Sequence, residues 1–299
     1  MFPIAYHPCY KYPVHEQHRF PMDKYELLPQ QLLREGIAEQ SNFFSSEPLD
    51  MPSVYAVHER EYADRVVQGK LTRQEMRRIG FEQTPMLAER ELRIANGTVR
   101  GALMAFKTGI AFNIAGGTHH AGPAQGEGFC MLNDQAIAAQ YLLDHQKAAK
   151  VLIVDLDVHQ GNGTAAILTH EPRVFTFSMH GKNNYPFRKE VSDLDIGLED
   201  KTGDRTYLQI LSDTLPDLIA DVKPDFIFYQ AGVDILYTDK IGRMSCTLEG
   251  CRRRDEMVLQ LAREHHIPVQ CSMGGGYSEQ LRLIIEAHAN TYRVAERIF

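Results

Sequence analysis

The chain has 299 residues, of which 43% are hydrophobic and 24% are charged, and these proportions exclude disorder and low complexity. Its 39 acidic and 32 basic residues give a formal charge of −7, and no Lys/Arg run stands out that could neutralise a phosphate backbone, so direct binding of nucleic acid is not expected. No apolar run approaches the roughly 20 residues that span a bilayer, and the N-terminal segment lacks the apolar core of a signal peptide, which predicts a cytoplasmic protein without a membrane partner.

Short apolar runs alternate with longer amphipathic runs along the whole chain. The strands that this pattern predicts are 3–6, 110–115, 151–156, 174–178, 225–230 and 268–272. The helices that it predicts are 23–34, 59–69, 133–145, 205–220, 248–265 and 278–298. Several of the strands are too apolar to have a solvated face. We therefore expect an α/β fold with a central, mostly parallel β-sheet that is covered by helices on both faces.

Composition along the chain indicates how it is organised. No Gly/Ser/Pro linker divides the sequence, so we expect a single domain over residues 1–299. The first 100 residues contain few strand patterns, and we interpret them as a cap on that domain. Residues 182–204 are polar and charged, which predicts a long surface loop. The five cysteines are scattered and never form a C-x-x-C pair, which predicts reduced thiols.

The residues that follow the predicted strands carry the chemistry, because ligands bind at the carboxyl ends of strands in open parallel sheets. One buried strand leads into Asp155, Asp157 and His159, which project to one side because strand side chains alternate between faces. Burying two carboxylates and an imidazole together is costly unless a cation neutralises them. Asp157 and His159, with Asp234 after a later strand, would leave a fourth position for water, as catalytic zinc sites do.

Further strand ends add a histidine pair and a phenol. The strand 110–115 leads through two glycines into His119 and His120, a pair that alone could be structural. The last strand leads through three glycines into Tyr277, whose hydroxyl could stabilise a developing oxyanion. Phe129 lies beside a glycine turn and alone would be a core residue more often than the wall of a substrate channel. Together, these strand ends favour an active site over a set of unrelated structural residues.

These segments, in this order, resemble the zinc-dependent histone deacetylase family. The motifs are specific and span nearly the whole chain: HPCY at 7–10, HRFPMDKY at 18–25, GGTHHA at 116–121, GEGFCMLND at 126–134, VDLDVHQGNG at 154–163, AGVD at 231–234 and GGGY at 274–277. Gln160 and Asn162 resemble class IV, whereas classes I and II generally have His and Asp at these positions. The resemblance implies the arginase/deacetylase fold.

The resemblance also implies a role for each residue of the site. The implied catalytic set comprises the zinc ligands Asp157, His159 and Asp234, the proton-transfer residues His119 and His120, and the oxyanion-stabilising Tyr277. The other implied contacts are Gly128 and Phe129 around the acyl-lysine stem, and a structural potassium ion at Asp155, Ser178 and Met179 with the backbone of Asp157 and His159. Because Asn162 replaces a carboxylate beside the second histidine, we expect His120 to have a lower pKa than its counterpart in classes I and II.

The implied reaction is removal of an acyl group, acetyl or longer, from the side-chain amine of lysine in a protein or peptide by zinc-activated water. A second hypothesis is deacylation of a small amine such as an acetylpolyamine, for which Glu82, Glu127 and the acidic loop around Asp193 could supply negative charge. A binding protein of the same fold with little activity is a third. A two-manganese hydrolase of the arginase type is less favoured, because Asp234 is the only carboxylate that we find after the later strand.

Overall fold

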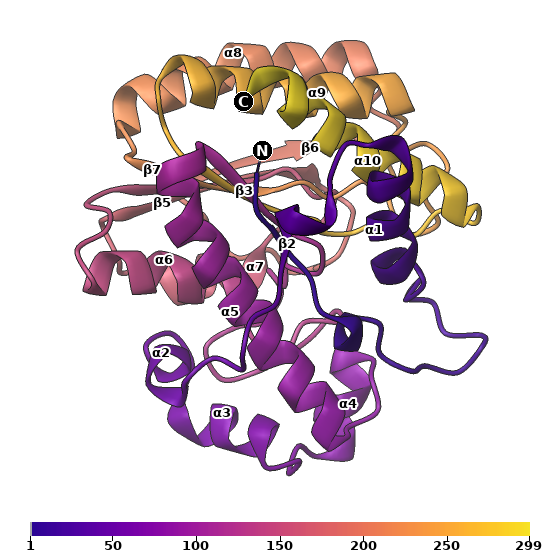
Figure 1. Cartoon of the computed structure of the whole chain (residues 1–299), viewed down its shortest axis with the longest axis vertical. Coiled ribbons are helices and arrows are strands. Elements are labelled where there is room, and N and C mark those ends of the chain that lie inside the picture. The colour runs from indigo at the N-terminus through magenta and orange to yellow at the C-terminus, as the bar shows by residue number, and fades with distance from the viewer. Residues whose placement is uncertain (1) are drawn as a thin grey trace.

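A single eight-stranded sheet forms the centre of the computed structural model, which describes residues 2–299 (Figure 1). Its strands are β1 (Ile4–Ala5), β2 (Phe43–Phe44), β3 (Ile110–Asn113), β4 (Val151–Asp155), β5 (Val174–Gly181), β6 (Leu194–Leu198), β7 (Phe226–Gln230) and β8 (Val269–Ser272). Their order across the sheet is β2-β1-β3-β8-β7-β4-β5-β6, and every pairing is parallel. The expected α/β architecture is therefore confirmed.

Helices cover both faces of the sheet, as a buried parallel sheet requires. The helices are α1 (Lys24–Glu35), α2 (Met51–Tyr55), α3 (Arg60–Val67), α4 (Arg73–Ile79), α5 (Pro85–Thr108), α6 (Asp134–Asp144), α7 (Asn162–Leu168), α8 (Asp204–Val222), α9 (Leu248–Glu264) and α10 (Leu281–Ile298), with short 3-10 turns at Pro8–Tyr10 and Gln40–Asn42. In Figure 1, α8 and α9 run along one side of the sheet, and α5 and α6 lie on the other. None of the helices in residues 2–299 combines the length and apolar character needed to cross a membrane.

The first 100 residues differ from the expected cap. They contribute the strands β1 and β2 to the sheet and most of α5, which packs against β3 and β8. Only α2, α3 and α4 gather at one end of the molecule, away from the sheet (Figure 1). The sequence pattern missed α5 even though Thr84 caps its first turn and Gly109 ends it in a left-handed conformation. Its polar residues Glu89, Arg93 and Arg100 recur at helical spacing, but the charged residues Arg90 and Glu91 interrupt the buried face and obscure the pattern.

The expected loop at 182–204 contains the edge strand β6, so this prediction is wrong for Leu194–Leu198. Its sequence LDIGL alternates apolar residues with the exposed Asp195 and Gly197, but the strand is short and lies within a polar segment. It pairs with β5, with Ser178 opposite Asp195. The predicted thiols are confirmed, because all five cysteines are free: Cys9, Cys130, Cys246, Cys251 and Cys271.

The centre of the sheet positions the candidate site. All residues of β4 and β7 are buried, and these two strands pair side by side with Asp155 opposite Gln230. On its other side β4 pairs with β5, which places Ser178 opposite Asp155. The residues that follow β4 and β7 therefore emerge next to each other at one edge of the sheet.

Candidate active site

Two carboxylates and an imidazole converge where β4 and β7 end. The Nδ1 atom of His159 lies 3.0 Å from Oδ1 of Asp157 and 3.1 Å from Oδ2 of Asp234. All three side chains are buried, and each offers a donor atom within 4.8 Å of the other two. Such a buried cluster needs either a proton on the imidazole or a cation to balance its charge. One nitrogen and two carboxylate oxygens form a donor set that fits Zn²⁺.

Backbone amides hold the two carboxylates in place. The amide of Gly275 donates to Oδ2 of Asp157 over 2.8 Å, and that of Val158 donates to Oδ1 of Asp234 over 2.9 Å. The chain approaches the carboxylates this closely because Gly232 and Gly275 have no side chain in the direction of the cluster. The glycine-rich turns of the sequence thus pack against the proposed metal ligands themselves.

The histidine pair at 119–120 has two different partners. Nδ1 of His119 lies 2.7 Å from Oδ2 of Asp155, whereas Nδ1 of His120 lies 2.7 Å from Oδ1 of Asn162. The ring centroids of the two histidines are 4.1 Å apart, and both side chains are buried. A carboxylate favours the charged imidazolium, while an amide oxygen accepts a hydrogen bond without adding a negative charge.

The pKa values of the pair diverge accordingly. Burial alone would lower the pKa of His119, but the carboxylates of Asp155 and Asp157 raise it to about 9. The pKa of His120 is lowered well below its usual range, chiefly by burial and then by the positive charges of His119 and His159. The hydrogen bond to Asn162 opposes this lowering of the pKa, and the expected difference from classes I and II stays a prediction.

Aromatic side chains surround the approach to this cluster. The rings of Phe129 and Tyr277 have centroids 6.0 Å apart, and Phe20 lies within 5.9 Å of both. Gly128 adopts a left-handed conformation, and a Cβ atom there would stand 2.7 Å from the ring of His120. Burial, with the charges of Asp234 and Asp157, raises the pKa of the Tyr277 phenol well above its usual value, so this hydroxyl remains a donor.

The other residues singled out in the sequence lie behind the cluster. Asp155 pairs in register with Ser178, whose hydroxyl lies 2.9 Å from Nδ1 of His180. Met179 is fully buried in β5. Gln160 is directed away from the cluster, since its amide donates to Asp195 and to the carbonyl of residue 190. Gln160 therefore anchors the loop before β6.

Two basic side chains near the site are buried, which the sequence does not predict. Lys24 is fully buried, donates to the carbonyl of Gly274 over 3.1 Å, and lies over the rings of Phe20 and Tyr277. Arg90 is also buried, pairs with Glu91, and lines the inner cavity. Both occur in helix-like segments, where a basic residue normally indicates a solvated face. No pattern in the sequence distinguished them from surface residues.

A third buried cation supports the ends of the two central strands. Arg254 of α9 pairs with Asp255, and both side chains are fully buried. Its guanidinium also donates to the carbonyls of Leu156 and Gly232, each of which lies shortly before a residue of the acidic cluster. Asp255 in turn accepts from Tyr229 and Thr291. This network fixes the turns from which Asp157 and Asp234 project.

Two cavities lie around the cluster, an inner one and an outer one. The inner cavity, of about 40 Å³, is lined by His119, His120 and Asp157, together with Phe129 and Tyr277. The outer cavity, of about 700 Å³, shares Phe129 and Tyr277 with it. Its rim carries charges of both signs, from Glu16, Arg19, Lys240 and Glu279. The shared aromatic residues place the outer cavity at the mouth of the inner one.

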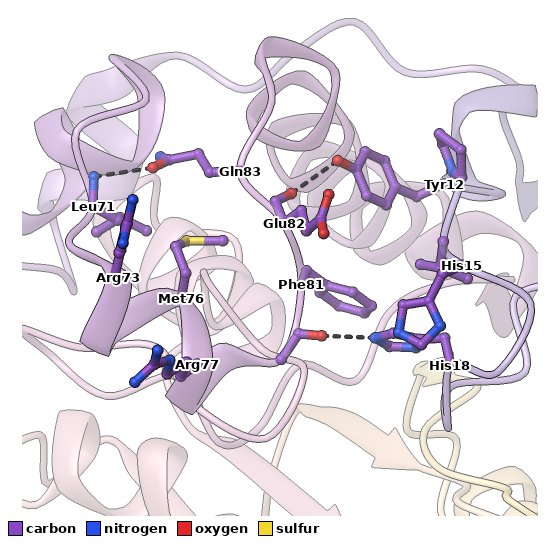
Figure 2. Close-up of a pocket in the computed structure, with 13 residues that line it drawn as sticks. Tyr12, His15, His18, Leu71, Arg73, Met76, Arg77, Phe81, Glu82 and Gln83 are labelled. Atoms are coloured by element: carbon purple, nitrogen blue, oxygen red, sulfur yellow. Dashed lines mark hydrogen bonds between the residues drawn. The ribbon is translucent and has the colours of Figure 1, made fainter.

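A separate groove of about 670 Å³ adjoins the mouth and shares His18 with it. Figure 2 shows α4, with Arg73, Met76 and Arg77, on one side and the N-terminal segment with His18 on the other, while Phe81 lies between them. Within residues 2–299 neither arginine forms an ion pair, and both are exposed. The groove is therefore locally basic on a chain whose overall charge is negative.

Comparisons with known proteins find relatives that match nearly the whole chain. Residues 18–292 match the histone deacetylase domain. An uncharacterised protein of a Picosynechococcus species is 43% identical over 298 residues, which cover 100% of this chain and 99% of that protein. Histone deacetylase 2 of Arabidopsis thaliana is 28% identical over 292 residues, covering 94% of this chain and 75% of the relative.

More distant relatives share the same extent. The acetoin utilization protein AcuC of Staphylococcus aureus is 26% identical over 304 residues, covering 94% of this chain and 78% of that protein. The crystal structure of the HDA15 HD domain superposes with a TM-score of 0.82 at 22% identity, covering 98% of this chain and 90% of that one. The structural match extends over the sheet and both of its helical layers.

Proposed function

Because the chain belongs to the histone deacetylase family, and is therefore a deacetylase with the arginase/deacetylase fold, we propose that it hydrolyses N-acyl-lysine in proteins or peptides with zinc as its metal. One observation carries this proposal. Through Asp157, the cluster that also contains His159 and Asp234 borders the same small cavity as His119, His120 and Tyr277. Catalysis of amide hydrolysis needs these components: a metal site, proton-transfer groups and an oxyanion donor.

We assign Zn²⁺ to Asp157, His159 and Asp234, because two carboxylates and one imidazole suit this ion and leave an open position. When bound, zinc supplies Lewis-acid polarisation of the scissile carbonyl and of a water molecule. A potassium ion is assigned to Asp155, Ser178 and Met179 on the neighbouring strands β4 and β5. These assignments rest on donor chemistry and burial.

The residues of the chain would divide the proton transfers between them. His120 is the neutral histidine of the pair, so it suits the general base that takes a proton from the attacking water. His119, which Asp155 keeps protonated, suits the acid that donates a proton to the departing lysine amine. Tyr277 would donate its hydroxyl to the oxyanion of the tetrahedral intermediate. The products are a free amine and a carboxylate.

Charge around the mouth favours an acyl-lysine peptide over a polyamine. Of the acidic residues that the sequence suggested for a polycation, Glu127 is buried against Asn162, and Asp193 accepts from the backbone amide of Thr176. At the rim of the outer cavity, Lys240 pairs with Glu279, and Arg19 offsets the charge of Glu16. Glu82 lies in the groove that also contains Arg73 and Arg77, which repel a polycation. We propose that this groove receives substrate residues beside the acyl-lysine, with a preference for acidic ones.

The small inner cavity, of about 40 Å³, supports a short acyl group such as acetyl over a fatty acyl chain. We also propose that residues 1–299 form one catalytic domain. Within the family, Gln160 and Asn162 support a place in class IV.

Peptide hydrolysis tests the function directly. We expect zinc-loaded wild type to cleave an acetyl-lysine peptide faster than octanoyl-lysine, myristoyl-lysine or acetylspermidine. Tyr277→Phe should lower kcat by roughly 100-fold because it removes one oxyanion donor. Tyr141→Phe, on the remote helix α6, is the matched control and should behave as wild type. If wild type cleaves none of the four substrates, the proposed function is wrong. If it cleaves acetylspermidine fastest, deacylation of a small amine replaces deacylation of lysine as the function.

A further inference from the structure

A buried carboxylate lies behind the partner of His120 and has no part in the mechanism above. The amide of Asn162 contacts His120 through its oxygen, with Oδ1 2.7 Å from Nδ1 of the imidazole. Its nitrogen, Nδ2, donates to Oε1 of Glu127 over 2.6 Å. All three side chains are buried, so water does not replace these contacts. The amide thus joins a histidine on one side to a carboxylate on the other.

The chemistry of the groups fixes the direction of this chain of hydrogen bonds. A carboxylate only accepts, so the NH₂ group of Asn162 must face Glu127 and its oxygen must face His120. Because that oxygen also only accepts, Nδ1 of His120 must carry the hydrogen. In the neutral ring, Nε2 then keeps the lone pair that a general base needs.

We propose that Glu127 is a positioning residue that sets the tautomer of His120 through Asn162. The inference rests on the proposed function for its catalytic meaning, since it concerns the base of that reaction. An amide alone can rotate by half a turn and present its NH₂ group to the imidazole, which would stabilise the opposite tautomer. The carboxylate of Glu127 removes this choice.

Glu127 itself is held in position by its own loop. Its carbonyl accepts from the amide of Cys130 over 2.9 Å, and its carboxylate adds to the effect of burial in raising the pKa of the Tyr185 phenol. The ring of Tyr185 lies edge-on to His120 with centroids 5.1 Å apart. The next residue, Gly128, packs against the ring of His120 so closely that no Cβ atom fits between them. The carboxylate is thereby fixed relative to the imidazole that it orients.

Three variants test the direction of the hydrogen bonds. Glu127→Gln keeps the shape but allows the Asn162 amide to reverse, so we expect kcat on the acetyl-lysine peptide to fall at least roughly tenfold with KM within about twofold. Asn162→Asp places two carboxylates in contact and should also be impaired. Glu127→Gln combined with Asn162→Asp again allows only one direction for the hydrogen bonds. The new Gln side chain at position 127 donates to the new Asp side chain at position 162, which accepts from His120. We expect this double variant to recover most of the lost kcat.

Glu264→Gln, on the exposed end of α9, is the matched control and should retain wild-type kcat. An unchanged kcat in Glu127→Gln would overturn the proposal. So would a double variant that is no more active than Glu127→Gln, because a merely structural role of Glu127 gives no reason for Asp to rescue it.

A second readout does not depend on activity. In the zinc-loaded protein, the ¹⁵N resonances of the His120 ring, assigned with His120→Gln, should report a protonated Nδ1 and an unprotonated Nε2. Glu127→Gln should lose this pattern, and the double variant should regain it. If wild type failed to cleave any acyl-lysine, the proposed function would fall while these spectra still decided the role of Glu127. A wild-type ring with its hydrogen on Nε2 would contradict the inference.

Discussion

A Cβ atom on Gly232 would stand 2.2 Å from Oδ2 of Asp157, the carboxylate that follows the neighbouring strand. No rotation of a methyl group relieves such a contact, so a side chain at this position must displace the carboxylate. Gly232 therefore acts on the acidic cluster by the absence of a side chain. A substitution at position 232 therefore changes the positions of the candidate metal ligands without removing any of the three.

We expect Gly232→Ala to weaken zinc binding by at least roughly tenfold, because misplacing one ligand disturbs the coordination geometry. Gly203→Ala is the control, since a Cβ atom there meets only an ordinary contact at 3.6 Å. Competition with a chromophoric chelator measures both affinities. Equal zinc affinities for the two variants would show that a side chain at position 232 does not displace Asp157.

Removal of the metal should lower stability as well as activity, because a ligand that binds only the folded state adds to the free energy of unfolding. We expect chelation to reduce Tm and zinc to restore it. Asp234→Asn should remove both responses, since it replaces one carboxylate of the cluster. Asp213→Asn, on the exposed side of α8, keeps all three candidate ligands and should retain both. Plasma emission on the purified proteins should find one zinc per chain in the control and little in Asp234→Asn.

Lys24 predicts a specific dependence of stability on pH. Burial lowers the pKa of its ammonium group to about 8, even though the carboxylates of Asp234 and Asp157 oppose the shift. Between pH 8 and roughly 10.5 the unfolded chain therefore binds more protons at this residue than the folded chain, and stability rises with pH. Relative to Lys24→Met, the free energy of unfolding of the wild type should rise by roughly 2 kcal/mol from pH 7 to pH 10.

Urea denaturation at several pH values measures this difference, and Lys147→Met, at an exposed position, is the control. Relative to Lys147→Met the wild type should show no such rise. A difference between wild type and Lys24→Met that stays constant with pH would contradict the burial of a charged Lys24.

The buried pair of Arg254 and Asp255 predicts that two arginine substitutions in α9 differ in their effect on stability. Arg254→Met leaves the carboxylate of Asp255 buried without its cation, which should cost about 3–5 kcal/mol in the free energy of unfolding. Arg252→Met removes only the ion pairs with Glu249 and Glu256 on the surface and should cost no more than about 1 kcal/mol. Denaturant unfolding of the two variants checks the contrast, and similar losses would argue against a supporting role for Arg254.

The sequence predicts the site where its residues follow buried strands. Asp157 and His159 could be placed on one side from strand alternation, and Asp234 from the rule that parallel strands end at one edge. Glu127 and Asn162 could not be connected in this way, because Glu127 lies on a loop and Asn162 begins α7, and their approach depends on packing around His120. Arg254 stands in a run of three arginines that is typical of a solvated face, and only the structure reveals that one of them is buried.

The position of β4 has a consequence for the exchange of the metal. This strand lies between β7 and β5, and its residues are fully buried, so its backbone amides can meet solvent only when the whole sheet opens. Asp157 and His159 directly follow it and share that high barrier to local opening. A bound ion must then leave past Phe129 and Tyr277 while the scaffold stays closed. We therefore expect mild denaturant that frays the surface helices to leave the rate of metal release unchanged.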